Sequence, residues 1–318
     1  MVLSVPSRRI GADGAATGVL ALGSWHTYDR MQFSETVRLL RDAVDAGITL
    51  FDVGVYGMPG GTPVFTDVIF SAAVRAAGLA REDYLLSAKL WLEDYPGYYP
   101  LRGQLEHALM RAGSDYADVV ILGDLHDQGA DLERLVLDLA AMQQAGLIRQ
   151  WGVNNWSATG IQTLIDAAAA HGVLGPAMAQ LKYSVARRSI ADGEPFARIF
   201  AQGVTLEASD VMEGGLLLGK SGRDVGRDPG EVRRRILASA AALRSLSDQV
   251  GATPAQLCLA FTLTHPALTT TLFGATSTAQ LRENVGAVDL LTRIGAAELR
   301  ALAAPLWVDK ELVDPEGT

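Results

Sequence analysis

Short apolar segments rich in β-branched residues alternate with longer amphipathic segments along the whole chain. The apolar segments predict strands and the amphipathic segments predict helices, because strands repeat every two residues and helices about every 3.6. The predicted strands cover residues 17–23, 49–54, 84–90, 119–125, 148–154, 177–183, 204–209 and 269–274. The predicted helices cover residues 34–46, 62–77, 100–112, 131–145, 157–171, 195–202, 253–264 and 278–288.

The order of these elements indicates the fold class. Several predicted helices are followed by glycine, which adopts the left-handed backbone conformation found at helix ends; these glycines are Gly47, Gly78, Gly113, Gly146, Gly172 and Gly203. Eight strand–helix units in one series predict a (β/α)8 TIM barrel of the α/β class. No linker is visible, so we expect residues 1–318 to form a single barrel domain.

Three segments lie outside the eight strand–helix units. Residues 7–16 predict an N-terminal hairpin that caps the bottom of the barrel, with Asp13 and Gly14 in its turn. Residues 211–251 contain a glycine-rich loop and an extra helix at 231–249, and residues 296–307 predict a last C-terminal helix. Because loops that follow strands build the active site of a TIM barrel, the segment after the seventh strand is predicted to form a lid or a cofactor clasp.

The composition of the chain limits the kinds of molecule that it is expected to bind. The chain has 318 residues, 49% of them hydrophobic, and a formal net charge of −9. This charge argues against nucleic acid and against an anionic membrane surface as partners, although a phosphorylated cofactor needs only a local positive patch. The single cysteine, Cys258, excludes an intramolecular disulfide, and its apolar helical surroundings favour a packing role.

The sequence shows no signal for export or for a membrane. The first seven residues lack the apolar region of a signal peptide. No apolar run approaches the length of about 20 residues needed to span a bilayer. We therefore expect a cytoplasmic protein.

Polar residues stand at the ends of two neighbouring predicted strands. Asp52 and Tyr56 follow the second strand, and Lys89 ends the third. Because the carboxyl ends of parallel strands meet on one face of a barrel, these side chains are expected to lie close together. An ammonium group beside a phenol lowers the pKa of the phenol, and a carboxylate fixes the ammonium group. The sequence thus predicts that Tyr56 donates a proton to a carbonyl oxygen.

With these residues and further motifs, the chain resembles the aldo-keto reductases over nearly its whole length. The order and spacing of the motifs carry the resemblance, and the later ones are most similar to the branch that contains the potassium-channel β subunits. The matching segments are residues 22–25, 47–52, 56–57, 87–89, 114–118, 146–149, 152–157, 214–220 and 274–276.

The resemblance implies roles for individual residues. Tyr56 corresponds to the general acid, Lys89 to the neighbour that lowers its pKa, and Asp52 to the partner of that lysine. The other matching positions imply contacts with NADP(H): the side-chain amides suit the nicotinamide carboxamide, and the last helix start suits a phosphate. The implied cofactor-binding residues are Ser24, Trp25, Asp52, Asn154, Asn155, Gln180, Ser209, Asp210, Met212, Gly214, Lys220, Gly274, Thr276, Gln280, Glu283 and Asn284.

The chain departs from the family pattern at its fourth catalytic position. Counting from Asp118, the histidine of the family is replaced by Gly123. Losing a donor that faces a developing oxyanion commonly costs about 3–4 kcal/mol. Three interpretations stay open. A bulge or a short insertion brings His126 into the vacant place as a catalytic residue, or another residue such as His26 or Asp124 lines a pocket for an unusual substrate, or simple carbonyl groups are no longer reduced.

Two further departures concern the cofactor. Ser209 stands where the family usually places an aromatic ring against the nicotinamide, and Gln280 stands where many relatives place arginine against the 2′-phosphate. A metal site at Asp124, His126 and Asp127 is disfavoured, because Lys89 would lie among its ligands.

Aromatic residues after the third strand have two interpretations. They either line the substrate pocket or pack on the surface; the residues are Trp91, Tyr95, Tyr98 and Tyr99.

The prediction is therefore an NADP(H)-dependent oxidoreductase that reduces a carbonyl or imine group of a small molecule, with Tyr56 as proton donor. Two alternatives remain. The same fold and the same Tyr56–Lys89 pair could serve a redox-neutral dehydratase, epimerase or lyase. The chain could also be a non-catalytic partner protein that senses a nucleotide. Its abundance of Ala, Gly, Arg and Val suggests a GC-rich source and specialised metabolism.

Overall fold

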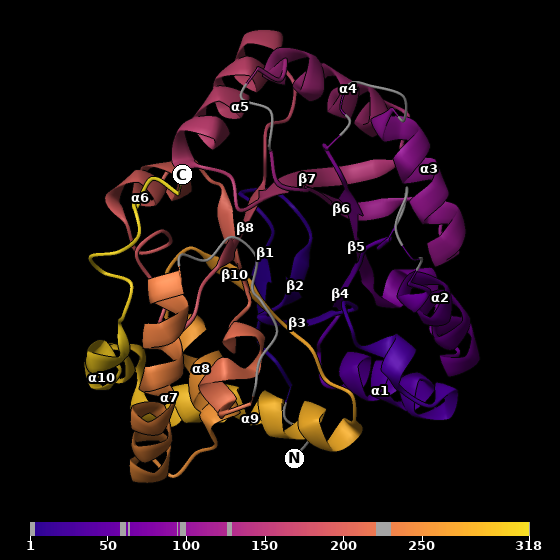
Figure 1. Ribbon diagram of the computed structural model, residues 1–318. Helices are drawn as coiled ribbons and strands as arrows, with labels where there is room; N and C mark the ends of the chain where they lie inside the picture. Colours follow the sequence, from indigo (N-terminus) through magenta and orange to yellow (C-terminus); the bar gives the residue numbers. More distant parts are fainter. Residues whose placement is uncertain are drawn as a thin grey trace.

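The computed structural model describes residues 4–57, 62, 64–93, 95, 100–125, 129–220 and 230–317, and its eight parallel strands close into a barrel (Figure 1). The strands follow one another in chain order, and β10 closes the barrel against β3. They are β3 (Leu20–Gly23), β4 (Leu50–Val53), β5 (Leu85–Leu90), β6 (Ala117–Leu122), β7 (Ile148–Asn154), β8 (Met178–Lys182), β9 (Thr205–Ser209) and β10 (Leu268–Phe273). The predicted TIM barrel is confirmed.

Helices surround the strands in Figure 1. The helices of the barrel units are α1 (Phe33–Asp45), α2 (Thr66–Ala77), α3 (Leu101–Ala112), α4 (Leu132–Gln144), α5 (Ala158–His171), α6 (Glu194–Phe200), α8 (Pro254–Thr262) and α9 (Thr278–Ile294). The predicted extra helices are α7 (Gly230–Gln249) and α10 (Ala296–Leu302). All six glycines predicted to end helices have positive φ angles, so glycine marked these boundaries correctly.

Two helix ends near the C-terminus differ from the sequence prediction by five residues or more. Helix α9 continues six residues beyond 288, because its apolar stripe extends through Leu290 and the chain turns only at Gly295, whose φ is 87°. Helix α10 ends at Leu302, and a short 3-10 helix, η4 (Ala304–Leu306), follows with Pro305 in its first turn. Proline cannot supply the N–H that a continuing α-helix needs.

The N-terminal hairpin closes the bottom of the barrel, as predicted. Strands β1 (Ser7–Arg9) and β2 (Ala16–Gly18) pair in antiparallel register. Ile10, in the turn between them, is fully buried and packs with Val119, Ile121 and Met178 from the barrel interior. This apolar plug fills the lower interior of the barrel.

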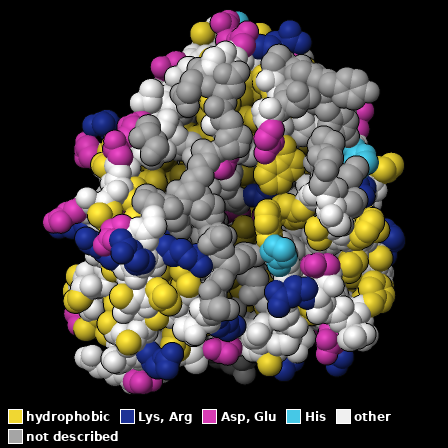
Figure 2. Space-filling view, viewed as in Figure 1, with side chains coloured by type: hydrophobic (Ala, Val, Ile, Leu, Met, Phe, Trp, Pro, Cys, Tyr) yellow, Lys and Arg dark blue, Asp and Glu magenta, His cyan; other side chains and the backbone are white. Residues whose placement is uncertain are grey.

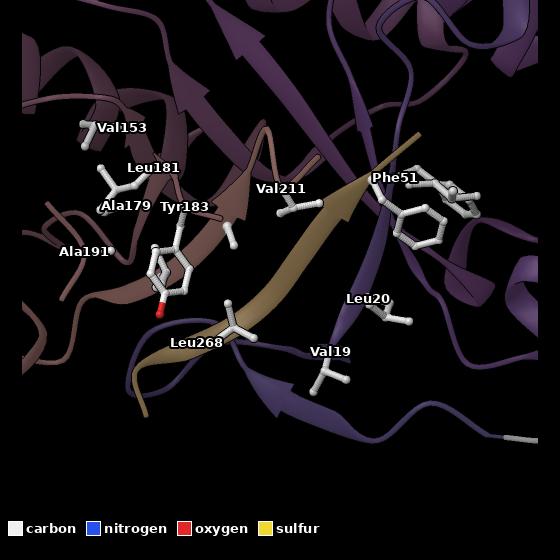
Figure 3. Packing of buried hydrophobic residues seen from close by; sticks show 14 of the residues in the cluster. Val19, Leu20, Phe51, Val153, Ala179, Leu181, Tyr183, Ala191, Val211 and Leu268 are labelled. Carbon is white, nitrogen blue, oxygen red and sulfur yellow. The ribbon is translucent and has the colours of Figure 1, made fainter. Parts of the chain in front are cut away.

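The outer faces of the strands pack against the helices. Phe51 of β4 lies 5.4 Å from the ring of Phe70 on α2, and Tyr183 after β8 lies 5.5 Å from Phe261 on α8. Figure 3 shows part of this packing, with Phe51 and Leu20 on one side of β10 and Tyr183 on the other. Because successive side chains point to opposite faces of a strand, every second residue is left for the interior.

Among the helices that the structure describes, none has the length and apolarity required to cross a bilayer.

Candidate active site

A cavity of about 1110 Å³ opens at the carboxyl ends of the strands. Figure 2 views this face, on which Lys and Arg side chains are exposed near the centre and in the lower half of the view. The volume exceeds that of most single-ligand pockets. Most of the predicted site residues line it: Trp25, Asp52, Tyr56, Lys89, Asn154, Asn155, Gln180, Ser209, Asp210, Met212, Gly214, Lys220, Gly274, Thr276 and Gln280.

Four predicted residues are not part of the described lining. Ser24 is fully buried below it, and its backbone N–H donates to the carbonyl oxygen of Asp52 at 2.9 Å. Asn284 is buried within α9, and Glu283 is exposed on the same helix. His126 lies outside the described residues, so its catalytic role stays a prediction, as do the cofactor contacts of the other three.

The Tyr56 side chain is held by its neighbours just beyond β4. Its ring folds back over Gly54, where an added Cβ would lie 2.7 Å from the Cζ atom of Tyr56. Glycine at 54 is therefore needed for the ring to lie there. The rings of Trp25 and Trp91 stand 4.5 Å and 6.0 Å from the Tyr56 ring. Tyr56 is 7% exposed and lines the cavity, with aromatic rings packed beside its own.

Asp52 and Lys89 form a buried pair at the floor of the cavity. They come from adjacent strands, and Lys89 Nζ lies 3.6 Å from Asp52 Oδ2. The hydroxyl of Ser87, directly across from Asp52 on β5, donates to the other carboxylate oxygen at 3.4 Å. Burial raises the pKa of Asp52, and the positive charge of Lys89 opposes that rise.

A hydrogen-bonded chain continues from Lys89 into the barrel. Its ammonium group donates to Gln180 Oε1 at 2.5 Å, and Gln180 Nε2 donates to Glu207 Oε2 at 2.7 Å. Glu207 is fully buried on β9, and burial, followed by repulsion from Asp52, raises its pKa to about 7. The sequence analysis missed Glu207. It stands two residues before Ser209 on one strand and so shares its face, which was an available signal.

Gly123 follows β6 and precedes Asp124, which lines the cavity. Its N–H donates to the carbonyl of Leu90 at 2.7 Å, and its carbonyl accepts from the Trp156 indole at 2.9 Å. A Cβ at position 123 would lie 2.8 Å from Trp91 Cε3. The Trp91 indole therefore occupies the space that a larger side chain at 123 would take. The indole N–H of Trp91 donates to the carbonyl of Val55 at 2.9 Å, which fixes this arrangement.

The asparagines at the end of β7 are engaged by their neighbours. Asn154 Nδ2 donates to Asp124 Oδ1 at 2.7 Å, and Asp124 also lines the cavity. Asn155 has a φ of 54°, and its side-chain oxygen accepts the backbone N–H of Lys182 at 3.1 Å. Its own N–H donates to the carbonyl of Gln180. These contacts place both amide side chains at the cavity edge in fixed orientations.

The predicted clasp after β9 is anchored by a buried ion pair. It contains the 3-10 helix η3 (Glu213–Leu218), in which Gly214 and Gly215 have φ angles of 63° and 100°. Arg187 contacts both carboxylate oxygens of Glu213, at 3.1 Å and 2.9 Å, and the hydroxyl of Ser184 donates to the carboxylate at 2.7 Å. Burial raises the pKa of Glu213, while Arg187 opposes the rise.

The far end of the cavity suits phosphate groups. It is bounded by Gly274 and Thr276 and by the start of α9, a helix of 17 residues capped by Ser277. Such a helix start attracts anions through its free N–H groups and its dipole. The cations on the described lining include Lys182 and Lys220. These residues fit the phosphates of a dinucleotide, and the amide side chains near Tyr56 fit a carboxamide.

Gln280 is engaged within its own helix start. Its Oε1 accepts the backbone N–H of Thr276 at 2.8 Å, and its backbone N–H donates to the Ser277 hydroxyl at 3.2 Å. Gln280 therefore shapes the loop that bounds the phosphate end of the cavity.

The C-terminal tail also lines the cavity, which the sequence analysis did not predict. Glu316 is fixed beside the start of α5, where its carbonyl accepts the N–H of Ala158 at 3.0 Å (Figure 1). No periodic pattern marks such an irregular segment, so only its path in the structure shows its position. The lining residues of the tail are Leu312, Val313, Asp314 and Gly317.

The structure describes part of the aromatic group and part of the candidate metal cluster that were considered from the sequence. Trp91 lines the cavity, whereas the Tyr95 hydroxyl donates to Asp138 on α4 at 2.9 Å; Tyr98 and Tyr99 lie outside the described residues. Within the described part of the chain, no group of three His, Cys, Asp or Glu side chains is placed to hold a metal. Of the candidate cluster, Asp124 is described, and His126 and Asp127 are not.

Comparison with known proteins adds a family match. Residues 19–303 match the aldo/keto reductase family. A putative voltage-gated potassium channel subunit beta from Schizosaccharomyces pombe is 26% identical, over 92% of this chain and 90% of that protein. A probable subunit of the same kind from Arabidopsis thaliana is 25% identical, over 95% and 94%. An L-glyceraldehyde 3-phosphate reductase from Escherichia coli K12 is 27% identical, over 90% and 88%.

Proposed function

Because this chain belongs to the aldo/keto reductase family, we propose that it is an NADP(H)-dependent oxidoreductase that reduces a carbonyl or imine carbon of a small molecule. Membership of the family implies NAD(P)H-dependent carbonyl reduction in general. The observation that carries the proposal for this chain is the buried Asp52–Lys89 pair, which shares one cavity with Tyr56 and with a phosphate-compatible helix start.

Each residue has a defined task in this proposal. The bound cofactor supplies a hydride to the substrate carbon. Tyr56 donates a proton to the substrate oxygen or nitrogen, and the ammonium group of Lys89 stabilises the negative charge left on the phenol. Asp52 holds Lys89 in place. Trp25 and Trp91 flank the Tyr56 ring and keep water from it.

The surroundings of Gly123 bear on the substrate. With the Trp91 indole against position 123, the proposed enzyme lacks the family's histidine donor there. A substrate already polarised in another way fits such a site: an imine, a conjugated carbonyl, or a sugar-derived ketone with neighbouring hydroxyl groups. Asp124, beside Gly123 on the cavity lining, is an acceptor for such hydroxyl groups.

NADPH binding and Tyr56→Phe together test the proposal. Tryptophan fluorescence should fall on titration with NADPH, because Trp25, Trp91 and Trp156 line the cavity. NADPH turnover with a nitrobenzaldehyde should fall at least about a hundredfold in Tyr56→Phe, since a general acid contributes roughly that factor or more, while the fluorescence titration stays unchanged.

Tyr28→Phe is the matched control. Tyr28 is a fully buried tyrosine whose hydroxyl has no hydrogen-bond partner among the described residues, so its removal should leave turnover intact. Undiminished turnover in Tyr56→Phe would refute the acid assignment. Absence of NADPH binding would favour the redox-neutral alternative, and binding without turnover would favour a nucleotide sensor.

A further inference from the structure

Glu207 is a buried acid that the proposed proton transfer does not use. It faces the barrel interior, in register with Gln180 on β8 and with Thr270 on β10. The charged groups that act on it are Asp52 and Lys89, from β4 and β5. A fully buried carboxyl group in the middle of a barrel strand is costly unless it is paired or hydrogen-bonded.

The hydrogen bonds of Gln180 give Glu207 a link to the active site. The Gln180 amide has one acceptor end and one donor end. Its oxygen accepts from Lys89, and its nitrogen donates to Glu207. If the amide turned over, its NH2 group would face the ammonium of Lys89 and repel it. Glu207 is the described acceptor that holds the amide in the orientation which attracts Lys89.

Charge balance makes this link sensitive to protonation. Lys89 lies 3.6 Å from Asp52 and reaches Glu207 only through Gln180. One ammonium group therefore faces two carboxyl groups, and the second carboxylate is uncompensated when both are ionised. Glu207 Oε1 has no hydrogen-bond partner in the described part of the chain, and neither has the adjacent Thr270 hydroxyl. These surroundings disfavour the charged form of Glu207 and so raise its pKa.

We propose that Glu207 is a positioning residue: through Gln180 it holds Lys89 at the floor of the cavity, and its proton adjusts the charge beneath Tyr56. The catalytic consequence depends on the proposed reductase function. Ionised Glu207 adds a negative charge that opposes the negative charge forming on the Tyr56 oxygen during reduction. Reduction is therefore fastest while Glu207 is protonated, and kcat falls as the pH rises past neutrality.

Two substitutions separate the effect of Glu207 on the position of Lys89 from the effect of its charge. Glu207→Met removes the acceptor and frees the Gln180 amide, so kcat should fall about ten- to a hundredfold, while the KM for the carbonyl substrate changes less than about threefold. Glu207→Gln keeps an acceptor without a charge, so kcat should stay within about threefold of the parent and lose its fall above neutral pH. Thr270→Val, in the same layer and of the same size, should change neither quantity.

A second measurement needs no turnover. The sequence has four lysines, Lys89, Lys182, Lys220 and Lys310, so NMR of protein with ¹⁵N-labelled lysine side chains can resolve each one. The buried, hydrogen-bonded ammonium of Lys89, assigned by its loss in Lys89→Met, should give a protected signal in the parent and in Glu207→Gln. That signal should broaden or vanish in Glu207→Met.

The outcomes distinguish the two proposals. The positioning role is overturned if Glu207→Met keeps the parental Lys89 signal, or if Glu207→Gln is as impaired as Glu207→Met. If no variant turns over NADPH while the Lys89 signal still depends on Glu207, the reductase function fails and the positioning role stands. Unfolding of Glu207→Met would show in its circular dichroism, and Glu207→Gln then carries the test through its pH profile and its Lys89 signal.

Discussion

Two glutamates, six positions apart, are both fully buried, yet their surroundings differ in kind. Glu213, in the segment after β9, receives two contacts from Arg187 and one from Ser184. Glu207, on β9 itself, receives one hydrogen bond from the neutral amide of Gln180. Burial raises the pKa of both carboxyl groups, but only Glu213 has a cation in direct contact to oppose that rise.

The difference shows that the hydrogen-bonding partner, rather than burial, decides whether the charge of a buried carboxylate is compensated. Arginine stays protonated at every physiological pH, so the Arg187–Glu213 pair is a constant anchor for the cavity wall. Glu207 has a pKa raised to about 7, so its charge changes within the physiological range. Glu213 is held to the cavity wall by a direct ion pair, whereas Glu207 has only a neutral amide as its hydrogen-bond partner among the described residues, although both lie on the same stretch of chain.

Arg187→Met should produce the largest effect, because it converts the anchored glutamate into an unpaired one. Breaking a buried pair by removing one partner typically costs about 3–5 kcal/mol, since the remaining charge is uncompensated. Urea unfolding at neutral pH measures the loss. The double variant Arg187→Met with Glu213→Leu should recover much of it, because it removes both charges. A double variant as unstable as the single one would contradict this view of the anchor.

Glu207 should make stability depend on pH in a direction that its raised pKa fixes. Between its ordinary value of 4.5 and about 7, the folded state holds the proton more tightly than the unfolded state. This contribution is fully present below 4.5 and is lost as the pH rises through about 7. Between these two values, the unfolded state binds fewer protons than the folded state does. Glu207→Gln should therefore gain stability over the parent with rising pH, by up to about 3 kcal/mol.

Denaturant unfolding at several pH values checks this dependence, with Glu213→Gln as the contrast. That variant removes the partner of Arg187, so its loss should be similar on both sides of neutrality. A difference between Glu207→Gln and the parent that stayed constant with pH would mean that Glu207 does not titrate in this range.

The periodicity and the glycines were sufficient to predict the barrel. The TIM fold, the hairpin and both additional helices are confirmed, because each depends on a local rule that the sequence obeys. The prediction was wrong at the end of α9, which continues through residues 289–294 to Gly295. The predicted helix stopped at 288, although the apolar stripe extends through Leu290 and a glycine follows the true end.

The location of the site at the strand ends was predictable, whereas the catalytic roles of its residues stay predictions. Asp52, Tyr56 and Lys89 stand at strand exits, and the structure brings all three to one cavity. Features that depend on two distant segments were not predictable. The indole of Trp91 fills the space beside Gly123, and no spacing within the sequence encodes that contact.

Ser184→Ala should have the smallest effect on stability of the three changes. It tests whether the charged partner of Glu213, rather than its hydroxyl partner, provides the anchor. It removes one donor to Glu213, along with the acceptor for the backbone N–H groups of Ala186 and Arg187. Because the guanidinium still contacts both carboxylate oxygens, the cost should be about 1–2 kcal/mol, with no change in the pH dependence of unfolding. A loss as large as that of Arg187→Met would assign the anchoring to the hydroxyl, and the contrast with Glu207 would then no longer depend on a charged partner.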